Sequence, residues 1–312
     1  MQSLRLTTDS IITARGSKNA VDARRPYAFL VEPEHSSSGR VEDVATIFLT
    51  NRECPFRCLM CDLWKNTTEE RVPVGAIPDQ IDYALSRLPP AKHIKLYNSG
   101  NFFDHQAIPP EDYEAIADRV RDFETVIVEN HPKLLNDDCF RFRDLIAGEL
   151  EVAIGLETAH PEVLQQLNKQ MTINDFEQVV RVLSKHDIAT RAFILLRPPF
   201  LSESEGVQWA LRSMEFAFGV GVLCCALIPT RDGNGIMEQL GQAGEFTPPS
   251  IRSLEEAFEA GLAMKRGRAF VDLWDVEKFY DCQQCGAARR DRLQQMNLTQ
   301  KILPAIDCRC CA

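Results

Sequence analysis

The sequence has no apolar run long enough to span a membrane, and its polar first fifteen residues contain no signal-peptide core. We therefore expect a cytoplasmic protein that does not bind a membrane. A surplus of basic residues is also lacking, since 35 Lys and Arg stand against 45 Asp and Glu and the net charge is −10. Affinity for a phosphate backbone depends on Lys and Arg that release counterions. This balance argues against broad nucleic-acid binding, so an RNA substrate would require a local basic surface or a partner protein.

Cysteine, in contrast, is abundant, with 11 in a chain of 312 residues. The count is odd and there is no export signal, so reduced thiols that bind metal are expected rather than a disulfide framework. A hydrophobic content of 45% with 26% charged residues is typical of a globular protein with a large core.

Short apolar runs alternate with amphipathic stretches along the chain. Six runs are strand-like: 44–50, 93–97, 125–128, 151–156, 190–196 and 222–228. Six stretches between them are helix-like: 77–88, 113–123, 139–147, 161–167, 174–186 and 203–218. Asn174 and Glu177 have the spacing of a capping box at the start of one such helix. This alternation predicts βα units and a mainly parallel sheet.

About six βα units suit an α/β fold in the form of a partial barrel, in which the chemistry lies at the carboxyl ends of the strands. Three regions are expected. They are a polar, irregular N-terminal extension over residues 1–43, a core barrel over residues 44–240, and a cysteine-rich C-terminal extension over residues 241–312.

Three cysteines, Cys54, Cys58 and Cys61, directly follow the first apolar run. Soft thiolates at this close spacing suit an iron–sulfur cluster, because a short loop can wrap one cluster. Three ligands for four irons leave one iron open to a small molecule. The alternative interpretation is a zinc site or a set of buried thiols.

Polar residues follow three of the later strand-like runs. Ser99, Gly100 and Asn101 come after the second run, and a Ser-Gly turn lets the backbone approach a ligand closely. Glu129 and Glu157 come just after the third and fourth runs, at the edge where the chemistry is expected. The alternative is that these are an ordinary turn and solvated surface charges.

The cysteine run resembles the cluster loop of radical S-adenosylmethionine (SAM) enzymes, whose CxxxCxxC motif matches Cys54, Cys58 and Cys61. The resemblance implies a partial (β/α)6 barrel and a [4Fe–4S] cluster whose open iron binds the amino and carboxylate groups of SAM. It also implies a reductant such as flavodoxin or ferredoxin, and a 5′-deoxyadenosyl radical that abstracts hydrogen from a substrate inside the barrel.

The same resemblance suggests which residues bind SAM. Ser99, Gly100 and Asn101 stand where these enzymes hold the SAM amino group with a glycine-rich segment. The stretch 155–172 resembles the "GLE…VL…NK…T" segment in which the Glu, here Glu157, contacts SAM; Glu129 is a second candidate. A sixth residue, Arg191, could pair with the SAM carboxylate if the strand register turns it inward.

Three further segments, 192–203, 244–252 and the tail from residue 282, resemble the family that contains the radical SAM subunit of archaeosine synthase. That family's known member breaks a carbon–nitrogen bond of a lysine carried by a 7-deazaguanine base in tRNA. This chain has Asp62-Leu-Trp-Lys65 after the third cysteine, where the archaeal enzyme is expected to have Gly-Tyr. The substrate therefore stays open between a modified tRNA nucleoside, presented with a partner protein, and a small metabolite. A non-catalytic metal-binding adaptor is the alternative from another class.

The tail offers a second set of thiols. Cys282 and Cys285, with Cys308 and Cys310, form two close pairs that suit a four-thiolate zinc site or an auxiliary iron–sulfur cluster, and Cys311 could replace Cys310. The thiols of three other cysteines are expected to be buried in apolar runs: Cys139, Cys224 and Cys225.

Six basic residues near the tail are the candidates for contact with RNA phosphates, with solvated helix surface as the alternative. They are Lys265, Arg266, Arg268, Arg289, Arg290 and Arg292.

Overall fold

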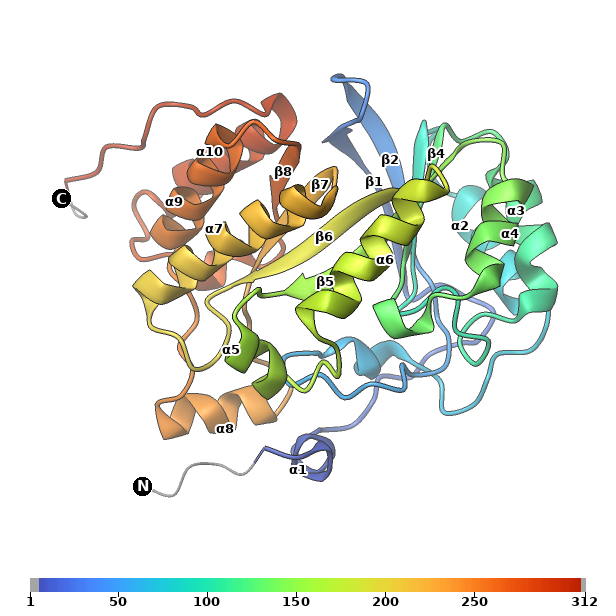
Figure 1. Ribbon diagram of the computed structural model, residues 1–312, viewed down its shortest axis with the longest axis horizontal. Helices are drawn as coiled ribbons and strands as arrows, with labels where there is room; N and C mark the ends of the chain where they lie inside the picture. The colour runs from blue at the N-terminus through green and yellow to red at the C-terminus, as the bar shows by residue number, and fades with distance from the viewer. Residues whose placement is uncertain (1–5, 310–312) are drawn as a thin grey trace.

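The structure, a computed structural model, describes residues 6–309. One eight-stranded sheet curls through the molecule in the order β1 to β8, with helices along its outer face (Figure 1). The strands are β1 (Ala28–His35), β2 (Val41–Phe48), β3 (His93–Tyr97), β4 (Thr125–Glu129), β5 (Glu149–Glu157), β6 (Ala189–Leu196), β7 (Cys224–Pro229) and β8 (Arg268–Val271). Strand β1 is antiparallel to β2, and β2 to β8 are parallel.

The predicted partial barrel is confirmed, and the six predicted strands are β2 to β7. Two strands were missed. Strand β1 lies in the segment expected to be irregular, because its Glu-Pro-Glu-His sequence does not read as a buried strand. Strand β8 has only four residues, so it gives little periodic signal.

Helices connect the strands and cover the outer face of the sheet. The α-helices are α1 (Thr8–Thr13), α2 (Ala76–Leu85), α3 (Tyr113–Val120), α4 (Asp137–Leu145), α5 (Pro161–Gln166), α6 (Ile173–Lys185), α7 (Glu203–Val220), α8 (Ile236–Ala243), α9 (Ile251–Ala263) and α10 (Gly286–Thr299). Short 3-10 helices are η1 (Leu63–Asn66), η2 (Pro110–Asp112), η3 (Pro132–Leu134) and η4 (Val276–Phe279). Within the described residues, none of the helices is long and apolar enough to cross a membrane.

The capping box of α6 differs from the predicted one. Thr172 is the N-cap, its hydroxyl accepts a hydrogen bond from the backbone N–H of Asp175, and the Asp175 carboxylate accepts one from the backbone N–H of Thr172. The sequence offers both this pair and Asn174 with Glu177. Thr172 is the residue with extended backbone at which the helix starts.

Alternation along the strands separates the barrel interior from the core. On β3, Ile94 and Leu96 are fully buried in the main apolar core under the helices. Lys95 lies between them and faces the other way, where its Nζ is 2.5 Å from Oε2 of Glu34 on β1. Successive residues of a strand point to opposite faces, so Glu34 and Lys95 mark the interior.

Helix α10 closes the gap between the two edge strands, β1 and β8, and packs against both. Side-chain amides at its carboxyl-terminal end make the hydrogen bonds to β8 that a ninth strand would make. Asn297 bonds both the N–H and the C=O of Val271, each at 2.9 Å, and Gln300 does the same to Ala269 at 2.9 and 2.8 Å. These four bonds satisfy backbone groups that an open edge would otherwise expose.

Two buried arginines of α10 tie this helix to α9 and to the chain end. Arg289 and Arg292 both pair with Glu255, and Arg292 Nε donates to the carbonyl of Pro304 at 2.8 Å. Glu255 is 5% exposed. Glu255 is therefore shared by two buried cations, and Arg292 also pairs with Glu259 at 2.7 Å.

Glu255→Ala should lower the free energy of unfolding by about 3–5 kcal/mol, because it leaves two buried guanidinium groups without their shared carboxylate. Urea unfolding followed by tryptophan fluorescence measures this loss. Glu256→Ala, on the exposed side of the same helix, is the matched control and should change stability by less than about 0.5 kcal/mol. Equal effects of the two substitutions would contradict the assignment.

Candidate functional site

The loop with Cys54, Cys58 and Cys61 follows β2, and three hydrogen bonds from distant segments fix it. The N–H of Leu59 donates to the carbonyl of Leu167 at 2.9 Å, at the end of α5. The Asn234 amide donates to the carbonyls of Leu59 and Cys61 at 2.8 and 3.2 Å. Because all three bonds use backbone atoms of the loop, they hold the loop and leave the thiols available.

Apolar packing adds to this anchoring. Leu59 is fully buried in a second apolar cluster, which also contains Ile11 of α1, Val163 of α5 and Met237 of α8. These three helices lie together at the lower side of Figure 1. The cysteine loop is therefore clamped against the carboxyl-terminal side of the barrel.

The segment after β3 lies directly against the first cysteine. The Asn101 Nδ2 group donates to Sγ of Cys54 at 2.9 Å, and its Oδ1 accepts from the backbone N–H of His131 at 2.8 Å. Ser99 and Gly100 both have left-handed backbone, with φ of 57° and 140°. A Cβ on Gly100 would lie 3.2 Å from Cys54 Cβ and 3.4 Å from its Sγ, so the turn needs glycine here.

Burial of the three thiols raises their pKa, to about 12 for Cys58, while the nearby Lys169 ammonium acts in the opposite direction on Cys54 and Cys58. Without a bound metal ion or cluster, these cysteines stay protonated at neutral pH. A bound metal or cluster would displace the protons, because it takes thiolates as ligands.

Glu157 ends β5 at the carboxyl edge of the sheet and forms a buried ion pair. Its Oε1 lies 2.5 Å from Nζ of Lys169. Glu157 has left-handed backbone, with φ of 64°, at an irregularity in the β5–β6 pairing. A Cβ on Gly155 would stand 2.1 Å from the Glu157 carboxylate and 2.4 Å from the Lys169 ammonium, so glycine makes room for the pair.

Glu129 ends β4, next to the turn after β3. Its Oε2 accepts a hydrogen bond from the backbone N–H of Asn98 at 3.2 Å. Burial raises the pKa of this carboxyl to about 7, and the hydrogen bonds it accepts and the charge of Lys169 offset only part of that effect. Glu129 can therefore hold or release a proton near neutral pH.

Lys169 and His131 complete the site, although neither was predicted from the sequence. His131 Nε2 lies 3.0 Å from the carbonyl of Lys169, and its Nδ1 accepts from the N–H of Lys133 at 3.2 Å. Burial lowers the pKa of His131 to about 3, so the ring is neutral with its proton on Nε2. Phe56 of the cysteine loop stacks on it at 3.8 Å.

A signal for both residues is in the sequence. Lys169 belongs to the Asn-Lys of the quoted motif, and His131 comes two positions after Glu129. Their roles depend on contacts between separate loops, which spacing along the chain does not reveal.

Arg191 does not lie at the edge where the cysteine loop is. It is the third residue of β6, 3% exposed, with Nη2 2.7 Å from Glu34 and Nε 2.5 Å from Glu151. Two carboxylates already neutralise its charge. This corrects the expectation of a cation that pairs with the SAM carboxylate.

Half of the predicted RNA-contacting cations are also engaged inside the protein. Arg289 and Arg292 bind Glu255, and Arg268 Nη2 is 2.8 Å from Glu151. These three are corrected from surface contacts to structural ion pairs. The other three of the set remain exposed: Lys265, Arg266 and Arg290.

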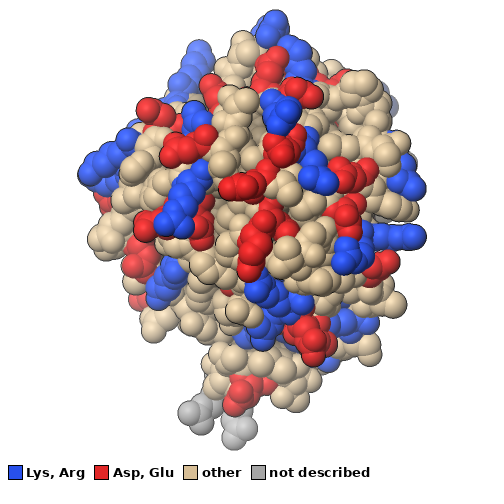
Figure 2. Space-filling model, turned by 90° about the vertical axis from the view of Figure 1, so that its right-hand side faces the viewer, with Lys and Arg blue, Asp and Glu red and all other residues tan. Residues whose placement is uncertain are grey.

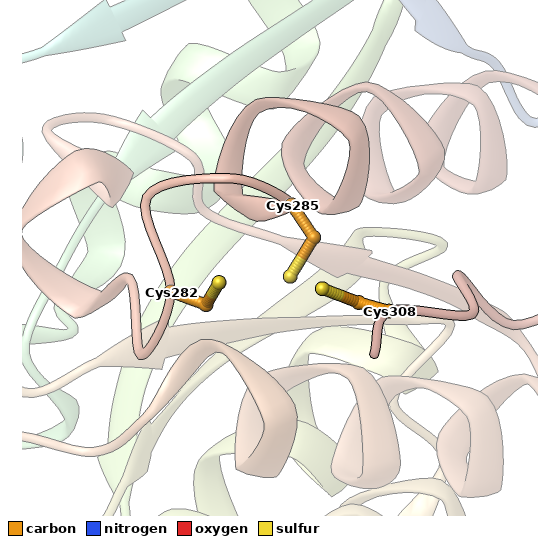
Figure 3. Close-up of side chains that lie close together, drawn as sticks. All are labelled: Cys282, Cys285 and Cys308. Atoms are coloured by element: carbon orange, nitrogen blue, oxygen red, sulfur yellow. The ribbon is translucent and has the colours of Figure 1, made fainter. Parts of the chain in front are cut away.

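The tail thiols of Cys282, Cys285 and Cys308 point toward one another (Figure 3), and their Sγ atoms all lie within 4.8 Å of each other. Cys310 and Cys311 lie outside the described residues. The prediction of buried thiols is confirmed for the remaining described cysteines, which are Cys139, Cys224 and Cys225.

Known proteins resemble this chain over most of its length. No protein-family model matches it. An uncharacterized protein of Methanocaldococcus jannaschii is 22% identical over an alignment of 321 residues, covering 93% of this chain and 86% of that protein. The archaeosine synthase subunit beta of Methanosarcina acetivorans is 24% identical over 273 residues, covering 81% of this chain and 77% of that subunit.

Solved structures share the fold. Elp3 of Methanocaldococcus infernus superposes with a TM-score of 0.51 at 12% identity, covering 67% of this chain and 55% of the Elp3 chain, just over half its length. Methylornithine synthase superposes with a TM-score of 0.52 at 12% identity, covering 70% of this chain and 63% of that one. The predicted resemblance to radical SAM enzymes is confirmed, and the chain has their half-barrel fold.

Gly100→Ala should reduce the iron bound per chain after anaerobic reconstitution, because the added Cβ would press on Cys54 in a strained left-handed turn, at a cost of about 1–3 kcal/mol. Gly39→Ala is the control. It introduces the same kind of strain at φ 80°, but nothing lies within 4 Å of its Cβ. Normal iron content in the Gly100 variant would show that this turn does not constrain the ligand loop.

Proposed function

We propose that the chain is a radical SAM enzyme whose three loop cysteines, Cys54, Cys58 and Cys61, ligate a [4Fe–4S] cluster. The observation that carries the proposal is a loop of three thiols clamped at the carboxyl edge of a half-barrel. The neighbouring strand ends supply polar groups at the same edge. When bound, the cluster and SAM would supply one-electron cleavage of SAM and abstraction of a hydrogen atom from the substrate.

The residues around the thiols fit this cofactor pair. The left-handed turn at Gly100 keeps side-chain atoms away from Cys54, and Asn101 donates to its sulfur. Lys169 places a buried positive charge near Cys58, where three thiolates would concentrate negative charge. For SAM itself we assign the turn at Ser99, Gly100 and Asn101, together with the carboxylates Glu129 and Glu157.

A layer of aromatic side chains on the inner face of the sheet is evidence for a substrate with a planar ring. It consists of Phe48, Tyr97, Phe193 and Trp274, with ring centroids 5.5 Å apart for Phe48 and Trp274 and 6.1 Å apart for Phe48–Tyr97 and Tyr97–Phe193. The first three are partly exposed, and Trp274, in the segment that follows β8, is 53% exposed. Aromatic faces of this kind stack nucleobases.

We infer that the substrate is a modified 7-deazaguanine nucleoside in tRNA, on which the enzyme would act as a carbon–nitrogen lyase. Support comes from the aromatic layer and from the similarity to archaeosine synthase subunit beta. The name "subunit" also supports a partner protein. On the face carrying α2, α3 and α4, basic and acidic side chains are interspersed (Figure 2), so a partner would supply the attraction for RNA there.

A small metabolite is the second candidate substrate, favoured by the net charge of −10. The two candidates separate in one assay, in which the reduced enzyme is supplied with SAM and either tRNA bearing the modified base or the free nucleoside. Turnover of the free nucleoside as fast as of tRNA would favour the metabolite.

The proposed chemistry is tested by anaerobic reconstitution with iron and sulfide, followed by addition of SAM and a reductant. The protein should turn brown and form 5′-deoxyadenosine, measured by chromatography. Cys58→Ala should abolish that product, whereas Cys139→Ala, a buried thiol in the apolar core, should retain it. A colourless protein with zinc in this loop and no SAM cleavage would instead support the metal-binding adaptor.

Glu157→Ala should weaken SAM binding by about 1–3 kcal/mol while the iron content stays normal, because one hydrogen-bond acceptor for SAM is removed. Glu162→Ala, an exposed acid in the next helix, should leave the dissociation constant unchanged. Because Glu157→Ala also leaves Lys169 unpaired, the double variant Glu157→Gln/Lys169→Met removes the ion pair as a unit. Normal SAM affinity in that double variant would rule out a direct contact with SAM.

Trp274→Ala should weaken binding of the base substrate by about 1–3 kcal/mol, because a stacking face is lost. Formation of 5′-deoxyadenosine without substrate should not change. Trp274→Phe keeps an aromatic face and should restore most of the affinity. If Ala and Phe bind the substrate equally, Trp274 does not stack on it.

A further inference from the structure

The described part of the tail brings three cysteines from two segments to one point. Cys282 and Cys285 precede α10, whereas Cys308 lies beyond its far end. The chain leaves α10 at Gln300, which has left-handed backbone with φ of 53°, and then returns along the helix. The mutual distance of the three sulfurs, at most 4.8 Å, results from this return.

Long-range contacts, rather than the cysteines alone, hold the returning segment. Arg292 donates to the carbonyls of Leu303 and Pro304, at 2.5 and 2.8 Å, and Arg289 donates to that of Ile306 at 3.3 Å. Both arginines are anchored on Glu255, as described above. These hydrogen bonds therefore fix the course of the backbone that brings Cys308 back to the start of α10.

The sulfur of Cys285 lies at the start of a helix and beside a cation. Cys285 is the N-cap residue of α10, and Arg289 Nε donates to its Sγ at 3.2 Å. Cys285 is buried, and the other two thiols are partly buried. A closed ligand set at this position would be shielded from exchange with solvent.

The spacing of the sulfurs favours a single metal ion over a four-iron cluster. Four thiolates at about 2.3 Å from one tetrahedral ion lie about 3.8 Å apart, which is compatible with sulfurs that all lie within 4.8 Å. Thiolates that ligate different irons of a four-iron cluster lie farther apart. The three thiols of the cysteine loop after β2 are not grouped this tightly among the described residues.

We propose that the three thiolates of Cys282, Cys285 and Cys308 bind a single zinc ion. Zinc is the ion that tetrahedral sites with several thiolate ligands at this spacing prefer. The site is separate from the cluster loop, and its failure would leave the proposed SAM chemistry standing.

The zinc site would act as a clip, in the sense that it would hold in place the helix that closes the barrel. It would fix the start of α10 and the returning tail together, and α10 is the helix that covers the edge of β8 and packs against β1. Binding free energy at such a site is folding free energy, because the site does not exist in an unordered tail. Zinc would therefore stabilise the edge-covering helix, far along the chain from the catalytic loop.

Metal analysis tests the proposal. A Cys54→Ala/Cys58→Ala/Cys61→Ala variant, which lacks the first ligand set, should bind about one zinc per chain. Adding Cys282→Ala and Cys285→Ala should remove it, whereas adding Cys139→Ala should not. Replacing zinc by Co²⁺ should give intense thiolate-to-cobalt absorption with tetrahedral d–d bands. Iron with sulfide at this site, or a disulfide between these cysteines in the native protein, would overturn the proposal.

Hydrogen exchange tests the role as a clip in the otherwise intact protein. Cys282→Ala/Cys285→Ala should raise exchange in α10 and residues 301–309 several-fold, while the absorbance of the first cluster and 5′-deoxyadenosine formation stay near those of the unaltered protein. Chelation of zinc from the unaltered protein should produce the same exchange pattern. Unchanged exchange after both treatments would overturn the clip.

Discussion

The buried ammonium group of Lys169 is the constraint on which the candidate site depends. Lys169 is only 9% exposed, so its charge needs a partner. That partner is Glu157, the last residue of β5, whose Oε1 lies 2.5 Å from the Lys169 Nζ. His131, at the end of β4, holds the Lys169 backbone carbonyl through Nε2. Through its stacking on Phe56, His131 also contacts the cysteine loop. The ends of β4 and β5 and the cysteine loop after β2 are thereby brought into one fixed arrangement.

Below this edge the barrel interior is layered. The aromatic layer comes first, and beneath it lies a network of ion pairs that joins Glu34 of β1, Lys95 of β3, Glu151 of β5 and Arg191 of β6. Buried charges this well paired contribute little net stability, but removing any one would take a partner away from a group of opposite charge. The network ties the antiparallel strand β1 to the parallel sheet and gives the aromatic layer a rigid floor.

The fold and the site could be predicted from the sequence where the signal lies within one short segment of the chain. The strands β2 to β7 are apolar runs of ordinary length, and the cysteine spacing lies within one loop, so both could be predicted. Strand β1 could not, because its Glu34 faces the barrel interior through ion pairs with Lys95 and Arg191, which are 61 and 157 residues away. The same contacts explain why Arg191 lies in the floor of the barrel. Lys169 escaped selection because its partners come from other strands.

In the proposed enzyme, three thiolates leave one iron of the cluster open to SAM. Electron paramagnetic resonance of the reduced, reconstituted protein detects this open iron, since a ligand bound to the cluster changes its signal. Saturating SAM should shift the g values of the cluster. SAM labelled with ¹⁷O or ¹⁵N at its carboxylate or amino group should add hyperfine coupling. An unchanged signal at saturating SAM, with all four irons already ligated by the protein, would show that no iron is open to SAM.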